Sequence, residues 1–172
     1  MNLLRTQLSS RFVSRCFSSF KDHDVVVAGF ARTPIGKLGG ALASINAPTL
    51  GAHAITAAVE RSGLQKADIE EAFMGNVVSA GIGQAPTRQA VVYAGLPVDC
   101  PSTTINKVCA SGMKATMLAA LSVATGYRNC VVAGGARDTV VYFFLSPLCL
   151  LLDRDGIHEQ HPLLPPQRTH RL

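Results

Sequence analysis

Several features that define other classes of protein are missing from this sequence of 172 residues. Its five cysteines are widely and irregularly spaced and form no Cys-x-x-Cys pair, which argues against a disulfide framework or a zinc site and favours a reducing compartment. Only 16% of the residues are charged while 48% are hydrophobic, so we expect a compact globular fold. The apolar stretch 140–152 is interrupted by Ser146 and Pro147 and is too short for a membrane span, which needs about 20 residues.

The sequence also lacks the pattern of a nucleic-acid-binding protein. Its formal net charge is +5, but residues 1–21 contain four basic residues and no acid, so most of that charge lies there. The rest of the chain has neither a basic stripe nor aromatic residues interleaved with basic ones. We therefore expect no nucleic-acid partner.

A glycine-rich loop containing Gly81 and Gly83 is superficially similar to a dinucleotide-binding motif. In the motif G-x-G-x-x-G, however, the third glycine is replaced here by Pro86. A nucleotide-binding α/β module is an alternative that lacks the required motif.

The order of the expected elements indicates an α/β fold. Strands are predicted at 24–31, within 69–79, at 103–108 and at 130–134, and helices at 49–62, 87–94 and 110–125. Because strands and helices alternate, right-handed crossovers and a largely parallel sheet sandwiched between helices are expected. The last of these helices is apolar on nearly every face, which predicts that it is buried on both sides beneath a further layer.

The two ends of the chain differ in composition from its middle. Residues 1–21 are rich in Arg and Ser and free of acid, which is typical of a mitochondrial transit peptide. Residues 137–172 contain one apolar run followed by a stretch with several prolines, and they show no helical or strand periodicity. We therefore predict a domain at 22–136 followed by an irregular tail.

Cys109 is the candidate for a reactive group. It is predicted at the junction between a strand and the helix 110–125, where backbone N–H groups and the helix dipole stabilise a thiolate, the nucleophilic form of cysteine. The three residues that follow, Ala110, Ser111 and Gly112, are small and leave the sulfur approachable. Position alone leaves open the alternative that Cys109 is a small buried hydrophobe, a common role of free cysteine.

The segments around and before Cys109 resemble the thiolase family. The segment NKVCASGMKA at 106–115 is similar to the thiolase acyl-cysteine motif, and further matches occur in order as VVVAGFARTPIGKLGGALA at 25–43, GNVVSAGIGQAPTRQA at 75–90 and VVAGGA at 131–136. The form NKVCASG resembles the biosynthetic branch, the acetyl-CoA C-acetyltransferases. This motif and the composition of residues 1–21, taken together, make the sequence most similar to the mitochondrial acetoacetyl-CoA thiolases.

The resemblance implies both a fold and a reaction. The fold is the amino-terminal half of the thiolase fold. In the implied reaction, Cys109 takes an acetyl group from one acetyl-CoA and passes it to a second, giving acetoacetyl-CoA and free CoA; the reverse direction is thiolysis. It further implies that neither metal nor redox cofactor takes part and that the complete family member is a homo-oligomer of the mitochondrial matrix. No residue of this chain is assigned to bind CoA.

The sequence departs from the family pattern after about residue 136. The second half of a thiolase supplies a histidine in a Gly-His-Pro motif and another cysteine in a glycine-rich motif, and neither occurs here. The tripeptide Gln160-His161-Pro162 lacks the preceding glycine. His53 lies within the predicted amphipathic helix 49–62 and is expected to be a boundary residue there, not a catalytic one. We therefore expect a truncated thiolase, with two readings: an enzyme by family, or an inactive isoform that associates with full-length subunits or is degraded.

Residues 1–25 are predicted to carry a fused fluorescent reporter into mitochondria, because their basic, acid-free composition suits import. Confocal imaging against a mitochondrial dye measures this. The control replaces Arg5, Arg11 and Arg15 with glutamine and should leave the reporter in the cytosol. A diffuse cytosolic signal from the native segment would show that the prediction is wrong.

Overall fold

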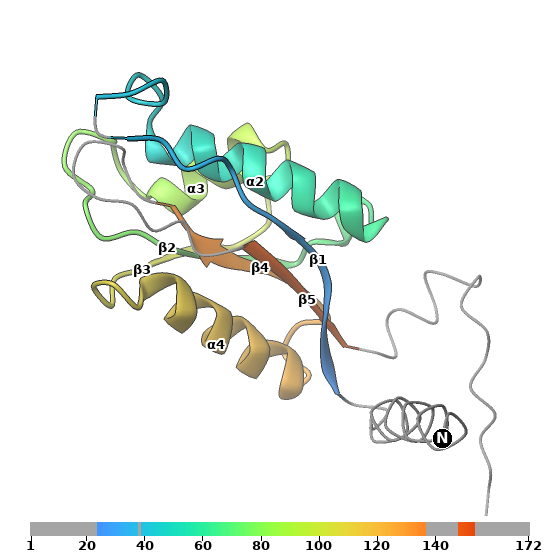
Figure 1. Cartoon of the computed structure of the whole chain (residues 1–172). Coiled ribbons are helices and arrows are strands. Elements are labelled where there is room, and N and C mark those ends of the chain that lie inside the picture. Colours follow the sequence, from blue (N-terminus) through green and yellow to red (C-terminus); the bar gives the residue numbers. More distant parts are fainter. Residues whose placement is uncertain (1–23, 38, 137–147, 154–172) are drawn as a thin grey trace, which may run out of the picture.

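The computed structural model describes residues 24–37, 39–136 and 148–153. The predicted transit segment 1–21 and most of the predicted tail lie outside these ranges. The described part forms a five-stranded sheet with helices on both faces (Figure 1). Its elements are β1 Val25–Ala31, α2 Ala47–Ser62, a 3-10 turn Lys66–Asp68, β2 Glu71–Gly75, α3 Pro86–Tyr93, β3 Ser102–Ile105, α4 Ser111–Ala124, β4 Cys130–Gly135 and β5 Leu148–Asp153.

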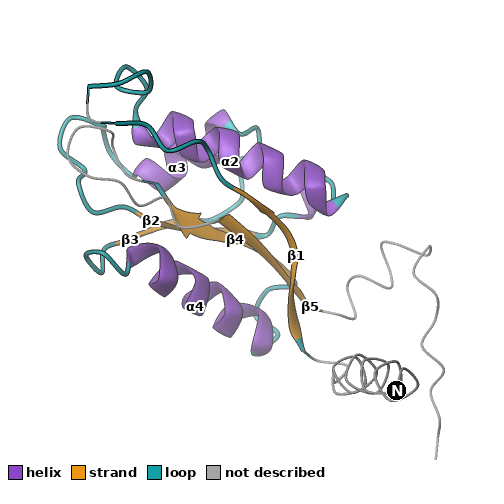
Figure 2. Cartoon of the chain, in the orientation of Figure 1, coloured by secondary structure: helices purple, strands orange, loops and turns teal. Residues whose placement is uncertain are grey.

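The sheet is largely parallel, as the sequence predicted. Its strand order is β1-β5-β4-β2-β3, and β2 pairs in parallel with both β3 and β4. β5 is antiparallel to both of its neighbours, so the other four strands run in one direction. Helices α2 and α3 cover one face and α4 covers the other (Figure 2). The predicted α/β class is confirmed.

The first helix illustrates why these elements form where they do. The side chain of Asn46 accepts hydrogen bonds from the backbone N–H of Thr49 at 3.0 Å and from its hydroxyl at 2.6 Å, which caps the helix. Pro48 suits the first turn, and Gly63 ends the helix in the left-handed region at φ 77°. α2 therefore begins at Ala47, two residues before the predicted start.

Alternation along β4 divides the core between the two faces of the sheet. Val132 belongs to the larger cluster beneath α2 and α3, while its neighbours Val131 and Ala133 belong to a smaller cluster with Ala119 and Val123 of α4. Successive strand residues point to opposite faces, so a run of apolar residues serves both layers. The buried residues of α4 are mostly small, which lets this helix lie close to the strands: they are Ser111, Gly112, Ala115, Ala119 and Val123.

The prediction of an irregular tail over 137–172 is wrong for residues 148–153. These residues form β5, which lies between β1 and β4 and contacts both α2 and α4. The sequence LCLLLD does not alternate between apolar and polar residues, so no strand period was visible. An uninterrupted apolar run is nevertheless typical of a strand that is covered on both faces.

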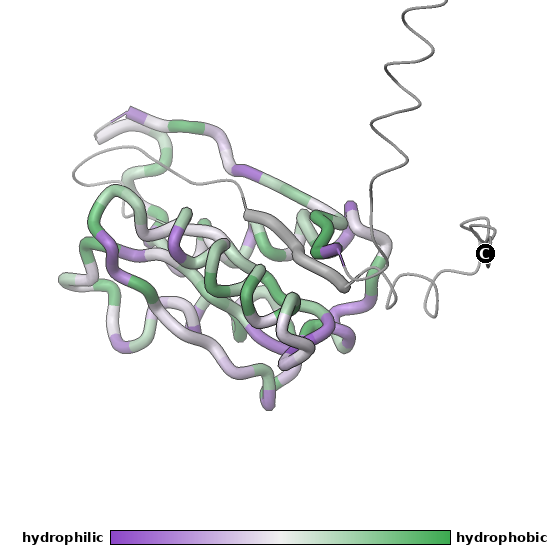
Figure 3. The backbone as a smooth tube through the Cα atoms, turned by 90° about the horizontal axis from the view of Figure 1, so that it is seen from below, coloured by the Kyte–Doolittle hydropathy of each residue, from purple (hydrophilic) through white to green (hydrophobic). Residues whose placement is uncertain are grey.

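The prediction that the last helix is buried on both sides is also wrong within the described residues. The inner face of α4 packs on the sheet, but Met113, Met117 and Leu121 are 66%, 57% and 59% exposed. They recur every four residues and so form one stripe on the outer face. Figure 3, seen from the side on which α4 lies, shows hydrophobic colour along this helix. The described elements include none that covers the stripe.

Candidate active site

The amino end of α4 touches the ends of two strands. A Cβ atom built on Gly75, the last residue of β2, would lie 2.5 Å from the backbone N of Gly112, closer than real Cβ contacts come. A Cβ on Gly135, at the end of β4, would lie 3.2 Å from Cα of Gly112. The helix can therefore approach this closely only because the strand ends carry no side chain. The contact fixes the start of α4 at the carboxyl edge of the parallel strands.

A strained turn joins β3 to α4 and carries Cys109. The strand was predicted to continue to residue 108, but it ends at Ile105 because the chain turns there. Val108 has a φ of 50°, in the left-handed region that a β-branched residue rarely adopts. Such strain persists only where the surroundings hold it, and it concentrates at functional sites.

Two side chains hold Val108 in this conformation. Its backbone N–H donates to Oδ1 of Asn106 at 3.1 Å, and its carbonyl accepts from Oγ of Ser111 at 2.6 Å. The same Ser111 hydroxyl oxygen accepts from the N–H of Lys107 at 2.8 Å. Hydrogen bonds therefore hold the peptide groups on both sides of Val108.

The sulfur of Cys109 is exposed in a locally positive setting. Ala110 is the N-cap of α4, and no side chain caps the helix by hydrogen bonding. Lys107 and Lys114 are the charged residues between 103 and 124, and that stretch contains no acid. The helix dipole and two cations that are close in sequence favour the binding of an anion at this position.

The other described cysteines are in a different state. Burial, together with the carboxylates of Asp68 and Glu70, raises the pKa of the Cys130 thiol to about 12. Burial also raises the pKa of Cys100, an effect that the nearby guanidinium of Arg88 partly offsets. Both thiols are protonated at neutral pH and enclosed in protein, which makes them poor nucleophiles.

The described part of the chain brings no histidine to Cys109. His53 is exposed on α2, which covers the face of the sheet opposite to α4. The segment Gln160-His161-Pro162 lies outside the described residues. The described residues also contain no cluster of His, Cys, Asp and Glu that could hold a metal ion, and no helix long and apolar enough to cross a bilayer.

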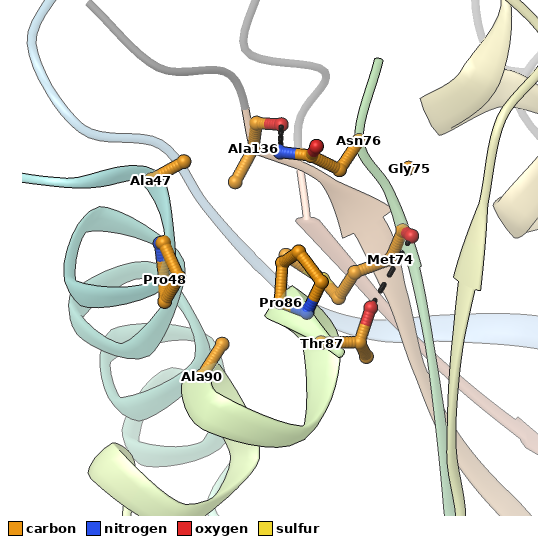
Figure 4. A pocket seen from close by; sticks show the side chains of 9 residues that line it. All are labelled: Ala47, Pro48, Met74, Gly75, Asn76, Pro86, Thr87, Ala90 and Ala136. Atoms are coloured by element: carbon orange, nitrogen blue, oxygen red, sulfur yellow. Dashed lines mark hydrogen bonds between the residues drawn. The ribbon is translucent and has the colours of Figure 1, made fainter. Parts of the chain in front are cut away.

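A small pocket lies on the other side of the strand ends, between α2, α3 and the sheet (Figure 4). Its lining is almost entirely apolar and does not include Cys109. The Thr87 hydroxyl bonds to the carbonyl of Met74, and the Asn76 amide donates to the carbonyl of Ala136 at 3.1 Å. These bonds hold the ends of β2 and β4 in place. They therefore support the edge of the sheet at which Cys109 lies, although the pocket is not part of the surface around Cys109.

Sequence reasoning singled out Cys109, which stays a prediction, but did not single out the residues that hold the turn before it. Asn106, two residues before Val108, and Ser111, three residues after it, have the spacing of side chains that bond to nearby backbone, which was the available signal. Gly75 and Gly135 carried no local signal, because their importance depends on a contact with a distant helix.

The chain belongs to the thiolase family. Residues 25–138 match the family described as "Thiolase, N-terminal domain". The chain is 53% identical over 128 residues to acetyl-CoA acetyltransferase B, mitochondrial, of Xenopus laevis and 51% identical over 129 residues to the human mitochondrial acetyl-CoA acetyltransferase. Each match covers 74% of this chain and 30% of the relative, so the chain spans about three tenths of the length of these relatives.

A solved structure supports the same assignment. The Acat5 thiolase of Ascaris suum, crystallised in complex with coenzyme A, matches with a TM-score of 0.64 and 42% sequence identity. The match covers 65% of this chain and 29% of that chain. The predicted fold, the amino-terminal part of the thiolase fold, is therefore confirmed.

Cys109 is expected to be alkylated by iodoacetamide before Cys100 and Cys130 at neutral pH. It is exposed at a helix start, whereas burial raises the pKa of both other thiols and encloses them in protein. Tryptic mapping follows the reaction, because cleavage after Lys107 and Lys114 isolates Cys109 in one peptide. In concentrated urea the three rates should converge. Faster labelling of Cys100 or Cys130 in the folded protein would contradict the assignment.

Proposed function

We propose that this chain provides the acyl-accepting half-site of an acetyl-CoA C-acetyltransferase, with Cys109 as the nucleophile. The observation that carries the proposal is the placement of this residue: an exposed thiol at the start of α4, after a strained residue, at the carboxyl edge of a parallel sheet. Membership of the thiolase family and about 50% identity to mitochondrial acetyl-CoA acetyltransferases support the choice of reaction.

The chemistry proceeds by two acyl transfers. The Cys109 thiolate attacks the thioester carbon of acetyl-CoA, and a new sulfur–acyl bond forms as the bond to the CoA sulfur breaks; the CoA thiolate leaves and takes up a proton. A second acetyl-CoA loses a methyl proton to a base, and its carbanion attacks the acetyl group on Cys109. Acetoacetyl-CoA forms and Cys109 returns as thiolate. The positive setting of the turn favours both the thiolate and the anionic CoA.

The base and the group that activates Cys109 are proposed to come from outside the described site. The family resemblance assigns these roles to a histidine in a Gly-His-Pro motif and to a second cysteine, and this sequence contains neither motif. Losing a general acid or base typically lowers a rate by about 10² to 10⁴-fold. We propose acetyl-CoA and acetoacetyl-CoA as substrates, without a metal or redox cofactor, and the mitochondrial matrix as the location.

A second candidate function is association with complete thiolase subunits without catalysis. The exposed stripe Met113, Met117 and Leu121 favours it, because an uncovered apolar helix face in a protein of this size often marks an interaction surface or an aggregation liability. The two functions differ in one respect that can be measured. Only the first requires acetyl transfer to Cys109.

The purified chain is expected to become acetylated at Cys109 by acetyl-CoA but not to complete thiolysis of acetoacetyl-CoA. Mass spectrometry of the tryptic peptide that contains Cys109 detects the added acetyl group, and a spectrophotometric assay follows thiolysis. Cys109→Ala is the control and should match the wild-type background in the second assay.

Acetylation that is absent, or equal on Cys100 and Cys109, would reject the nucleophile. Thiolysis that Cys109→Ala abolishes would show instead that the chain builds a complete site.

A further inference from the structure

The hydroxyl of Ser111 connects the rigid sheet to the turn that carries Cys109. Ser111 is 4% exposed and lies in the contact between α4 and β2, where a Cβ on Gly75 would come within 2.8 Å of its own Cβ. Its Oγ accepts from the N–H of Lys107 and donates to the carbonyl of Val108. One hydroxyl therefore bonds to the peptide group before Lys107 and to the peptide group between Val108 and Cys109.

These bonds act on the residue that is strained. Val108 would relax towards a negative φ if it were free, because its branched side chain disfavours the left-handed region. Rotation about φ of Val108 would turn the following peptide and with it the Cα–Cβ bond of Cys109. The direction of the thiol, and its position relative to the amino end of α4, therefore depend on what holds Val108.

We propose that Ser111 is a positioning residue for Cys109, whose hydroxyl keeps Val108 in the left-handed conformation and the sulfur over the positive end of α4. The proposal rests on the proposed role of Cys109 as nucleophile. Asn106 assists from the other side, because its Oδ1 accepts from the N–H of Val108. Ser111 need not touch substrate, since it acts through the backbone.

The test compares Ser111→Ala with Thr116→Ala. Thr116 is the matched control: it lies on the same helix, and its hydroxyl donates to the carbonyl of Gly112 at 3.1 Å without touching the turn. The rate of iodoacetamide reaction at Cys109 is measured across pH by tryptic mapping, and urea unfolding is measured in parallel. Stability alone would affect both variants, whereas positioning affects the pH profile of one.

We expect Ser111→Ala to slow alkylation of Cys109 about tenfold at pH 7 and to move the pH profile of the reaction, since the sulfur is no longer held in one direction at the amino end of α4. Thr116→Ala should remain within about twofold of wild type. Asn106→Ala, at an exposed position, is the second variant and should shift the profile in the same direction even if Ser111→Ala does not fold.

The possible outcomes distinguish the positioning role of Ser111 from the proposed role of Cys109 as nucleophile. Unchanged profiles in a folded Ser111→Ala, or in Asn106→Ala where Ser111→Ala does not fold, would overturn the positioning role while leaving Cys109 as nucleophile. Shifted profiles together with no acetylation by acetyl-CoA would support the positioning role and reject the proposed reaction. A wild-type Cys109 no more reactive than in urea would overturn both.

Discussion

The glycine contact beneath the amino end of α4 is the constraint on which the site depends. Gly75 and Gly135 end two neighbouring strands, and their missing side chains allow the backbone of Gly112 to lie against the sheet. This contact fixes where α4 starts, and it leaves a short span between the end of β3 and the helix for the chain to cross. The chain crosses that span in a tight turn in which Val108 has a left-handed conformation, and Cys109 follows Val108.

The rest of the fold supports this edge. Small side chains on the inner face of α4 keep the helix close to β4 along its length, and the alternating residues of β4 serve the layers on both faces. Bonds from Asn76 and Thr87 hold the strand ends from the opposite side. Cys109 therefore lies at the exposed edge of a rigid scaffold, which is where functional residues of α/β folds commonly occur.

Much of this arrangement could be predicted from the sequence. Alternating strand and helix patterns predicted the α/β class, and small residues after Cys109 at a strand-to-helix junction indicated a reactive thiol. The misses have physical causes. β5 was missed because LCLLLD lacks the alternation of a half-buried strand, and the exposed stripe on α4 was missed because composition does not reveal whether an apolar helix has a covering layer. The role of Gly75 depends on a contact between segments far apart in the chain, whereas Ser111 bonds to residues three and four positions away, a local spacing that the sequence does show.

The most direct test of this account is the effect of Gly75→Ala on the reactivity of Cys109, with Gly81→Ala as control. A Cβ on Gly81 meets nothing within 4 Å, so that variant introduces only the strain of a left-handed residue, about 1 to 2 kcal/mol. Gly75 does not have a positive φ, so Gly75→Ala introduces no such backbone strain; instead it must displace the start of α4, which costs about 1 to 3 kcal/mol of overpacking. The account predicts that Gly75→Ala alone abolishes preferential alkylation of Cys109. A folded Gly75→Ala protein as stable as Gly81→Ala, with Cys109 still alkylated first, would contradict it.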